Sequence, residues 1–289
     1  MRPAVLWRAT RAYSLPASVV PVALGTVLAA RGYGAATGHF SAAVFIITLL
    51  GAILAHFGAN VMNDYFDFVK GVDTRPEHGS GVLTGGSMTP SFALGFALAL
   101  LAGAGACGAL LLRHNSDVLI LAAIGLACAV LYPTFLKKHG LGDLLIVVAF
   151  GVGLTVGAYA VQIGAGAHQA WLLIALYSLP VCLLVDAILH ANNLRDAADD
   201  RAAHVRTLAT VLSPAAGKMW QRFLLFGPLV FVVLGVVSRL LPAWSLATFL
   251  SVPFLVGAAR SGSVPGTAQT HLIFGLLYTL SLLLRPALI

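Results

Sequence analysis

The sequence carries very little charge: Asp, Glu, Lys and Arg together make up 9% of its 289 residues. Soluble domains carry about 25% charged residues, and so few charged side chains cannot cover a water-facing surface of this size. Hydrophobic residues account for 59% of the chain, and the mean hydropathy is +0.93. The composition therefore excludes a soluble protein and indicates a polytopic membrane protein.

Cysteine is also scarce, with three residues, Cys107, Cys128 and Cys182, all inside apolar runs. They show no CxxC spacing and no even count, which excludes a disulfide framework and a cysteine zinc site. We interpret them as small buried helix residues. The glycine-rich stretch 78–90 lacks GK[ST], which excludes a nucleotide P-loop. We interpret that stretch as a flexible lid.

A convincing signal-peptide cleavage site is likewise missing after the basic amino terminus, so the first apolar run is typical of a spanning helix. The net charge of +7 would suit a nucleic-acid-binding protein. The basic residues, however, sit between apolar segments, as the positive-inside rule for membrane proteins requires. We therefore expect the lipid bilayer as a partner and no nucleic acid.

The apolar runs predict an all-α bundle of about nine transmembrane helices around a central cavity that opens near the cytoplasmic face. The expected spans lie at 12–30, 41–62, 91–112, 117–135, 142–162, 170–192, 219–239, 243–260 and 268–286. We treat 1–289 as a single transmembrane domain. Its halves, 1–135 and 136–289, are candidates for an ancient duplication.

The basic residues fall mainly on one side of this topology. When the connections alternate between two sides, thirteen Lys and Arg residues share the side of the amino terminus and four lie on the other. The positive-inside rule places the basic side in the cytoplasm. The acidic residues gather there too, although they have little topological force. This indicates a functional site on the cytoplasmic side of an inner (cytoplasmic) membrane.

The first acidic motif closes the second expected span and reads HFGANVMNDYFDFVKGVD, residues 56–73. On a helix, His56, Asn60, Asn63 and Asp67 share one face. Asp64 stands three residues before Asp67, which places two carboxylates side by side at a helix end. Like charges so close repel unless a cation lies between them. Carboxylate and amide oxygens suit a hard cation such as Mg²⁺, which binds through one or two carboxylates plus substrate phosphates.

The second acidic motif closes the sixth expected span and reads HANNLRDAADDR, residues 190–201. Asn192, Asp196 and Asp200 recur at helical spacing, and Asn193 precedes Asp196 by one turn. Each cluster alone is explained equally well as a solvated helix end. The asparagines and Asp186 lie too deep for that explanation, since polar groups at membrane depth usually line a cavity or a pathway. We interpret the polar residues of the two motifs as the lining of one shared cavity.

These motifs resemble those of the UbiA-type intramembrane prenyltransferases. Asn63-Asp64-Tyr-Phe-Asp67 with Asp73 is similar to the family's first motif, and the form NNxRDxxxDR at 192–201 is similar to its second. The second form is closer to the 1,4-dihydroxy-2-naphthoate branch than to the 4-hydroxybenzoate branch. Further similar stretches are SLPASVVPVALGT at 14–26, LYPTFLKKHGLGD at 131–143, GAYAVQ at 157–162 and the triplet RTL at 206–208.

The resemblance implies that two Mg²⁺ ions, held between the motifs, grip a polyprenyl diphosphate whose chain is transferred to an aromatic ring. Such metals neutralise charge on the leaving group. The implied metal ligands are Asp64, Asp67, Asp73, Asp196 and Asp200, supported by Asn60, Asn63, Asn192 and Asn193. Asp200 is preferred over its neighbour Asp199 because it completes the family spacing.

Basic residues near the motifs are candidates for direct diphosphate contacts, because both Lys and Arg suit phosphate. We choose Lys137 and Arg201, with Lys70 as a second-rank candidate. A positive-inside anchor explains Lys137 equally well. For Arg195 and Arg206, a salt bridge to the adjacent carboxylates is the favoured interpretation.

Departure of the diphosphate would leave an allylic cation, which aromatic faces stabilise. Tyr132 and Tyr159 are the aromatic candidates for this role. Asp186 lies within a span and outside the family motifs. It either forms a hydrogen bond with the acceptor or pairs with His190, one helical turn later. Our hypothesis is that it faces the acceptor pocket.

The favoured acceptor is 1,4-dihydroxy-2-naphthoate, which would lose its carboxyl group during menaquinone biosynthesis. Alternatives are 4-hydroxybenzoate, another naphthoate, a chlorin, haem or a lipid. A membrane transporter is the rival class, because intramembrane polar residues also mark transport pathways and a half-chain repeat would suit one. Against it, the acidic clusters crowd one face, whereas a transporter site lies near the midplane.

Overall fold

The computed structural model describes residues 2–73, 75, 79–116, 119–120, 123–125 and 142–284, and every regular element in them is helical. The long helices are α2 (Pro16–Ala30), α3 (Ala42–Val69), α4 (Pro90–Leu111), α8 (Trp171–Ala202), α10 (Pro214–Val237) and α12 (Val264–Leu283). Two further long segments are built from shorter helices that follow one another directly. They are α6 (Gly142–Ile146), η3 (Val147–Gly153) and α7 (Leu154–Ile163), and then η5 (Ala243–Ser251) and α11 (Val252–Ser261).

Capping residues in the sequence fix where several spans begin. Ser41, Thr89 and Ser213 each accept a hydrogen bond from the backbone N–H three residues on. Proline follows directly at Pro90 and Pro214, where the missing N–H has no helical partner in any case. The polar connections are therefore followed by abrupt helix starts.

Seven segments of the described chain are long and apolar enough to cross a membrane. They correspond to seven of the nine expected spans. The expected last span is a helix, α12, but its length and composition do not place it among the seven. The expected fourth span, 117–135, lies mostly outside the described residues. The all-α membrane bundle is thus confirmed, while the count of nine stays a prediction.

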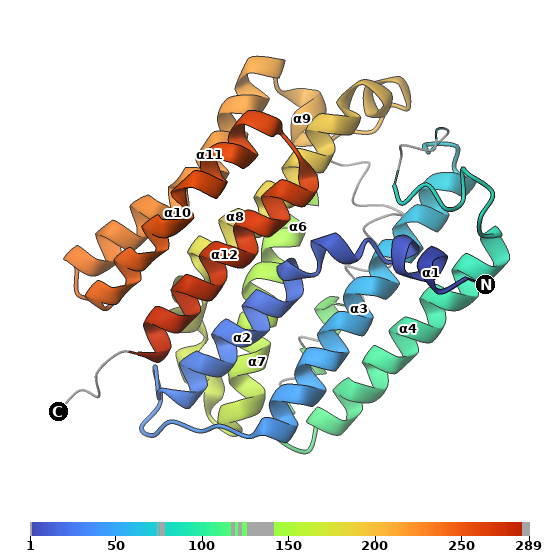
Figure 1. Cartoon of the computed structure of the whole chain (residues 1–289). Coiled ribbons are helices and arrows are strands. Elements are labelled where there is room, and N and C mark those ends of the chain that lie inside the picture. Colours follow the sequence, from blue (N-terminus) through green and yellow to red (C-terminus); the bar gives the residue numbers. More distant parts are fainter. Residues whose placement is uncertain are drawn as a thin grey trace.

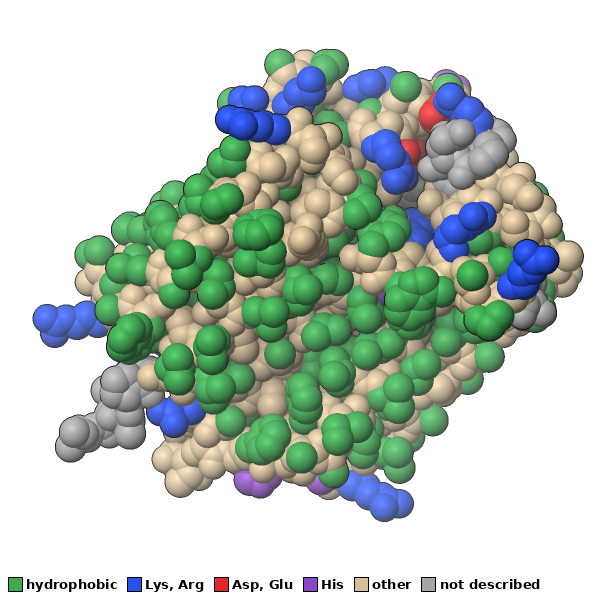
Figure 2. Space-filling model, viewed as in Figure 1, with side chains coloured by type: hydrophobic (Ala, Val, Ile, Leu, Met, Phe, Trp, Pro, Cys, Tyr) green, Lys and Arg blue, Asp and Glu red, His purple; other side chains and the backbone are tan. Residues whose placement is uncertain are grey.

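The helices form one bundle in which α3 and α4 pack together on one side and α10 to α12 on the other (Figure 1). Between them lie α2, α7 and α8. Hydrophobic side chains cover the flank of the bundle in Figure 2, while most of the visible Lys and Arg side chains gather toward one end. Both acidic motifs finish their helices at this end, which we call the acidic end.

The segment α6–η3–α7 carries a π-helical stretch, η3, in the wall of the bundle. A Cβ added at Gly151 would lie 2.4 Å from Cys182 Sγ, so glycine permits a close approach of η3 to α8. Irregular π turns of this kind are frequent at functional sites. Here the stretch contributes Val148, Phe150 and Val152 to the lining of the cavity described below.

The amino-terminal segment crosses α3 before the first span begins. It consists of α1 (Pro3–Ala9) and η1 (Ala12–Ser14), joined at Arg11, whose φ of 49° lies in the left-handed region. The Trp7 ring meets Phe57 of α3 edge-on, with ring centroids 6.1 Å apart. Asn60 donates a hydrogen bond to the Thr10 carbonyl oxygen at 2.9 Å. These contacts hold the segment against the polar face of α3.

The glycine-rich stretch after α3 is anchored rather than free. Val82, Leu83 and Met88 are buried in a hydrophobic cluster with residues of α3 and α4. The interpretation of 78–90 as a flexible lid is therefore wrong for its later part, because these apolar side chains are packed away from water. Residue 78, the first of this stretch, lies outside the described residues.

Candidate active site

Both acidic motifs line one cavity at the acidic end of the bundle. The cavity has a volume of about 1130 Å³ and lies among α3, α4, α6–α7 and α8. Its polar lining includes Asn60, Asn63, Asp67, Asp73, Asn192, Asn193, Asp196, Asp199 and Asp200. Most of the remaining lining is Ala, Gly, Leu, Ile and Val. The arrangement is an oxygen-rich rim above a large apolar chamber.

In the first motif, Asn63 orients Asp67. The Asn63 amide donates a hydrogen bond to Asp67 Oδ2 at 2.9 Å. Its carbonyl oxygen Oδ1 is buried and finds no hydrogen-bond partner among the described residues. A buried oxygen of this kind, next to a buried carboxylate, is the donor chemistry that a hard cation takes.

Asp64 does not itself line this cavity, and its carboxylate lies against Arg11 and the loop that follows α3. Its Oδ1 forms an ion pair with the Arg11 guanidinium, and its Oδ2 accepts the Ser80 backbone N–H at 2.9 Å. A Cβ added at Gly79 would lie 2.8 Å from Asp64 Oδ1 and 2.9 Å from Asp73 Oδ2. Two carboxylate oxygens of the motif therefore converge on the glycine, which has a φ of +61°.

In the second motif, Arg195 clamps Asp196. Its Nε and Nη2 each donate to one carboxylate oxygen at 2.7 Å, and Nη2 also reaches Asn192 Oδ1 at 2.9 Å. The salt bridge favoured for Arg195 is thus confirmed. Asn193 and Asp200 are buried in the cavity wall. Asp199 pairs with Arg75, so an arginine after the first motif reaches the second.

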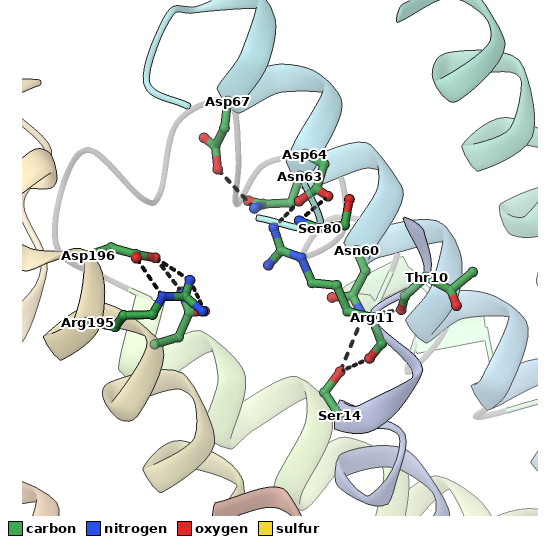
Figure 3. Close-up of polar contacts among 11 residues, drawn as sticks. Thr10, Arg11, Ser14, Asn60, Asn63, Asp64, Asp67, Ser80, Arg195 and Asp196 are labelled. Atoms are coloured by element: carbon green, nitrogen blue, oxygen red, sulfur yellow. Dashed lines mark hydrogen bonds and ion pairs between the residues drawn. The ribbon is translucent and has the colours of Figure 1, made fainter. Parts of the chain in front are cut away.

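The two motifs face one another across the same space (Figure 3). Asn63, Asp64 and Asp67 come from α3, whereas Arg195 and Asp196 come from α8. Within the described chain, no three His, Cys, Asp or Glu side chains are grouped closely enough to hold a metal ion by themselves. A cation between the motifs would complete its coordination with oxygens of a ligand, as Mg²⁺ does with phosphates.

A hydrogen-bonded network continues below Asp64 on α3. Ser14 donates its hydroxyl hydrogen to the Arg11 carbonyl oxygen at 2.8 Å and lies 2.9 Å from His56 Nε2. Because that hydrogen is committed, the histidine donates from Nε2, and its Nδ1 accepts from Ser18 at 2.9 Å. The His56 ring also meets Phe150 edge-on in the cavity wall. The histidine therefore fixes the backbone that carries Arg11.

Several residues expected in the site are placed elsewhere. Tyr159 is fully buried and donates its hydroxyl to the Tyr33 carbonyl oxygen at 2.8 Å. Asp186 is buried near Asp143, and neither residue lines the cavity. Lys70 lies over the Phe66 ring at the end of α3.

Two basic candidates for diphosphate contacts, Arg201 and Lys137, lie in the expected second half of the chain, 136–289. Arg201 donates to the carbonyl oxygens of Ala209 and Thr210, at 2.9 and 3.3 Å, and so holds the short helix α9 (Leu208–Val211). Lys137, like Tyr132, lies outside the described residues. Among the described residues, the arginine that lines the cavity is Arg11, which lies outside both acidic sequence motifs.

The model of the UbiA prenyltransferase family matches residues 19–282. The chain is 33% identical over 294 residues to the UbiA prenyltransferase domain-containing protein 1 of Mus musculus, covering 96% of this chain and 84% of the relative. The protein of that name from Xenopus tropicalis is 31% identical over 290 residues, covering 96% and 81%.

Solved structures share the fold. The apo structure of a UbiA homolog from Aeropyrum pernix K1 matches with a TM-score of 0.71 at 20% identity, covering 93% of this chain and 96% of that one. A UbiA homolog from Archaeoglobus fulgidus, bound to DMAPP and Mg²⁺, matches with a TM-score of 0.59 at 14% identity, covering 97% and 99%. At these identities the likeness concerns the fold.

Fold and site together define a class: a multi-pass α-helical membrane protein in which two acidic helix ends share one largely apolar cavity. The chain belongs to the UbiA prenyltransferase family. It is accordingly an enzyme that transfers prenyl groups.

Proposed function

We propose that this prenyltransferase moves a polyprenyl chain from its diphosphate to an aromatic acceptor, with Mg²⁺ as the cofactor. The observation that carries the proposal is the single cavity that both acidic motifs line above an apolar chamber. The rim suits a charged diphosphate, and the chamber suits a hydrocarbon chain and an aromatic ring. The UbiA homolog from Archaeoglobus fulgidus, solved with DMAPP or GPP and Mg²⁺, supports a prenyl diphosphate donor and Mg²⁺ as the cofactor.

The carboxylates proposed to hold two Mg²⁺ ions are Asp64, Asp67 and Asp73 on one side and Asp196 and Asp200 on the other. The unpartnered Asn63 Oδ1 and the convergence of Asp64 and Asp73 at Gly79 fit such ions. When bound, the metal ions neutralise the negative charge of the leaving diphosphate.

The residues of the chain position the reactants and exclude water. Asn63 and Arg195 fix the orientation of Asp67 and Asp196. The C1–O bond of the donor breaks with its electron pair on the diphosphate, and an acceptor ring carbon supplies the pair for the new C–C bond. That carbon then releases a proton, or carbon dioxide where it bears a carboxyl group. The apolar chamber keeps water from the allylic cation.

The acceptor is proposed only as a class. The names of the relatives described above specify no acceptor, and they do not bear out the expected assignment to the menaquinone branch. Dihydroxynaphthoate, 4-hydroxybenzoate, other naphthoates, chlorins, haem and lipids therefore enter the test as equal candidates. Asp186 does not line the cavity, and we propose no contact between it and the acceptor.

We also propose that the acidic end faces the cytoplasm. Described basic residues at this end include Arg2, Arg8, Arg75 and Lys218, whereas Arg31, Arg113 and Arg239 follow the opposite ends of α2, α4 and α10. This distribution follows the positive-inside rule. Labelling of single introduced cysteines from either side of sealed vesicles would test it.

The decisive experiment is prenyl transfer by the purified protein in lipid, with labelled prenyl diphosphates and a panel of acceptors. We expect a prenylated aromatic product that requires Mg²⁺ and disappears in Asp64→Ala and Asp196→Ala variants that remain folded. Product formation by a folded variant carrying both changes would defeat the mechanism. Transport of a panel member across vesicles without product would instead favour the transporter.

A further inference from the structure

The side chain of Arg11 lies against the first acidic motif. Its guanidinium pairs with Asp64 Oδ1, and the two side chains are 12% and 6% exposed. A Cβ added at Gly79 would lie 2.9 Å from both Arg11 Nη2 and Asp73 Oδ2, so the arginine and the second carboxylate of the cluster both lie against this glycine. In Figure 3 the side chain reaches from the amino-terminal segment to the end of α3.

The backbone around Arg11 is fixed, although its side chain is long. The residue is held at a left-handed φ of 49°. Its carbonyl oxygen accepts from Ser14, which His56 holds in turn, and the preceding carbonyl oxygen of Thr10 accepts from Asn60. The guanidinium can therefore change partners without any movement of the segment that carries it.

The guanidinium has donor capacity left for a ligand. Arg11 lines the cavity, and its Nε is buried without a hydrogen-bond partner among the described residues. An arginine fork matches phosphate oxygens with two parallel hydrogen bonds. A diphosphate between the motifs would supply acceptors within reach of the same side chain that now holds Asp64.

A cation and Arg11 compete for Asp64. A metal ion bound at Asp64 Oδ1 would lie against the positive guanidinium, and like charges a few ångströms apart repel strongly where water is scarce. Arg11 must leave Asp64 before the metal takes this oxygen. Leaving is favourable only when another anion accepts the arginine, and a donor diphosphate in the cavity would be such an anion.

We propose that Arg11 couples metal binding to donor binding: it reserves Asp64 until a diphosphate arrives, so that the metal at Asp64 enters together with the donor. This proposal rests on the metal–diphosphate function proposed above. It assigns to the amino-terminal segment the control of the order in which the ligands bind.

The test measures binding of Mn²⁺, as a paramagnetic stand-in for Mg²⁺, by electron paramagnetic resonance of the purified full-length protein. Inorganic pyrophosphate is the diphosphate probe, and the Mn²⁺–pyrophosphate complex in buffer is the blank. For the wild type we expect pyrophosphate to tighten Mn²⁺ binding about tenfold, within the usual range of coupling between sites. Arg11→Gln should bind Mn²⁺ alone about tenfold more tightly and lose most of the pyrophosphate effect.

Two further variants separate charge from folding. Arg11→Lys keeps the charge without the fork, so Mn²⁺ alone should bind as weakly as in the wild type while the pyrophosphate effect shrinks. Arg8→Gln removes an exposed arginine one turn earlier that does not line the cavity, and it should behave as the wild type.

The outcomes distinguish this proposal from the function on which it rests. Equal Mn²⁺ affinity of wild type and Arg11→Gln, with equal gains from pyrophosphate, would overturn the coupling and leave the metal site in place. Absence of Mn²⁺ binding by the wild type with or without pyrophosphate would overturn the metal–diphosphate site itself.

Discussion

Arg75, in the loop that follows the first acidic motif, forms an ion pair with Asp199 in the second motif, 124 residues later in the chain. The pair ties the loop after α3 to the end of α8 at the rim of the cavity. It is the direct side-chain bridge between the two motif regions that the described residues show.

The bridge should contribute little to stability. The two side chains are 58% and 35% exposed, and exposed ion pairs contribute about 0–1 kcal/mol. We expect a double-mutant cycle of Arg75→Ala and Asp199→Ala, read from thermal unfolding, to give a coupling energy below about 1 kcal/mol. A coupling several times larger would mean that the pair is part of a wider network.

Gly79 should be sensitive to a methyl group because of its surroundings. Gly79→Ala would place Cβ within 3.0 Å of Asp64, Arg11 and Asp73, whereas Gly71→Ala meets nothing within 4 Å. Both glycines have φ near the left-handed region, at +61° and +70°. Each substitution therefore costs about 1–2 kcal/mol of backbone strain.

Only Gly79→Ala should also disturb the site. We expect similar thermal stability for the two variants but a much lower donor affinity for Gly79→Ala, measured as KM for the prenyl diphosphate. Matched KM values would show that the Asp64–Arg11–Asp73 arrangement does not contribute to donor binding.

Asp200 and Asp199 are adjacent carboxylates with different settings, and they should differ in effect. Asp200 is buried in the cavity wall, whereas Asp199 is drawn toward Arg75. A metal contact worth several kcal/mol corresponds to a loss of at least about a hundredfold in kcat/KM for Asp200→Asn. Asp199→Asn should lose clearly less. The reverse order would move the second metal contact to Asp199.

His56 should act through the position of Arg11. His56→Phe keeps a ring against Phe150 but removes both serine contacts. The buried Ser18 hydroxyl then loses its histidine partner, which should cost about 1–3 kcal/mol of stability. We expect donor KM to rise more than kcat falls, and Ser14→Ala to shift KM in the same direction. His39→Gln, an exposed histidine at the opposite end, is the control. A fall in kcat alone would place His56 in the chemical step.

Arg201 should affect stability and not donor binding. Its guanidinium holds the carbonyl oxygens of Ala209 and Thr210 instead of lining the cavity. Arg201→Ala should therefore lower the unfolding temperature, because each lost hydrogen bond from the charged guanidinium contributes at most about 1.5–3 kcal/mol. The donor KM should stay unchanged. A tenfold rise in KM would restore the sequence-based assignment of Arg201 to the diphosphate.

The gathering of the two motifs could be predicted because helical periodicity and topology are sufficient for it. Asn63 with Asp67, and Asn192 with Asp196, are one turn apart in the sequence and hydrogen-bonded in the structure. Alternating spans then bring both helix ends to the same side of the bundle. This prediction needs only the spacing of the residues within each motif and the number of membrane spans between the motifs.

The partners of the site could not be predicted, because they depend on rotations and kinks that no local pattern records. Tyr159 points to Tyr33 since α7 is turned that way by its packing on α2. Arg11 reaches Asp64 because the chain takes a left-handed turn at an ordinary arginine, with no glycine or asparagine to signal it.

The Arg11–Asp64 pair also bears on how the protein is made. Both partners lie in the first quarter of the chain, and Asp196 follows Asp64 by 132 residues. The positive charge that Asp64 needs is thus synthesised ahead of it. The first motif can be neutralised while the ribosome is still producing α8. We expect insertion of α3 into the bilayer to be complete before the catalytic cavity has its second wall.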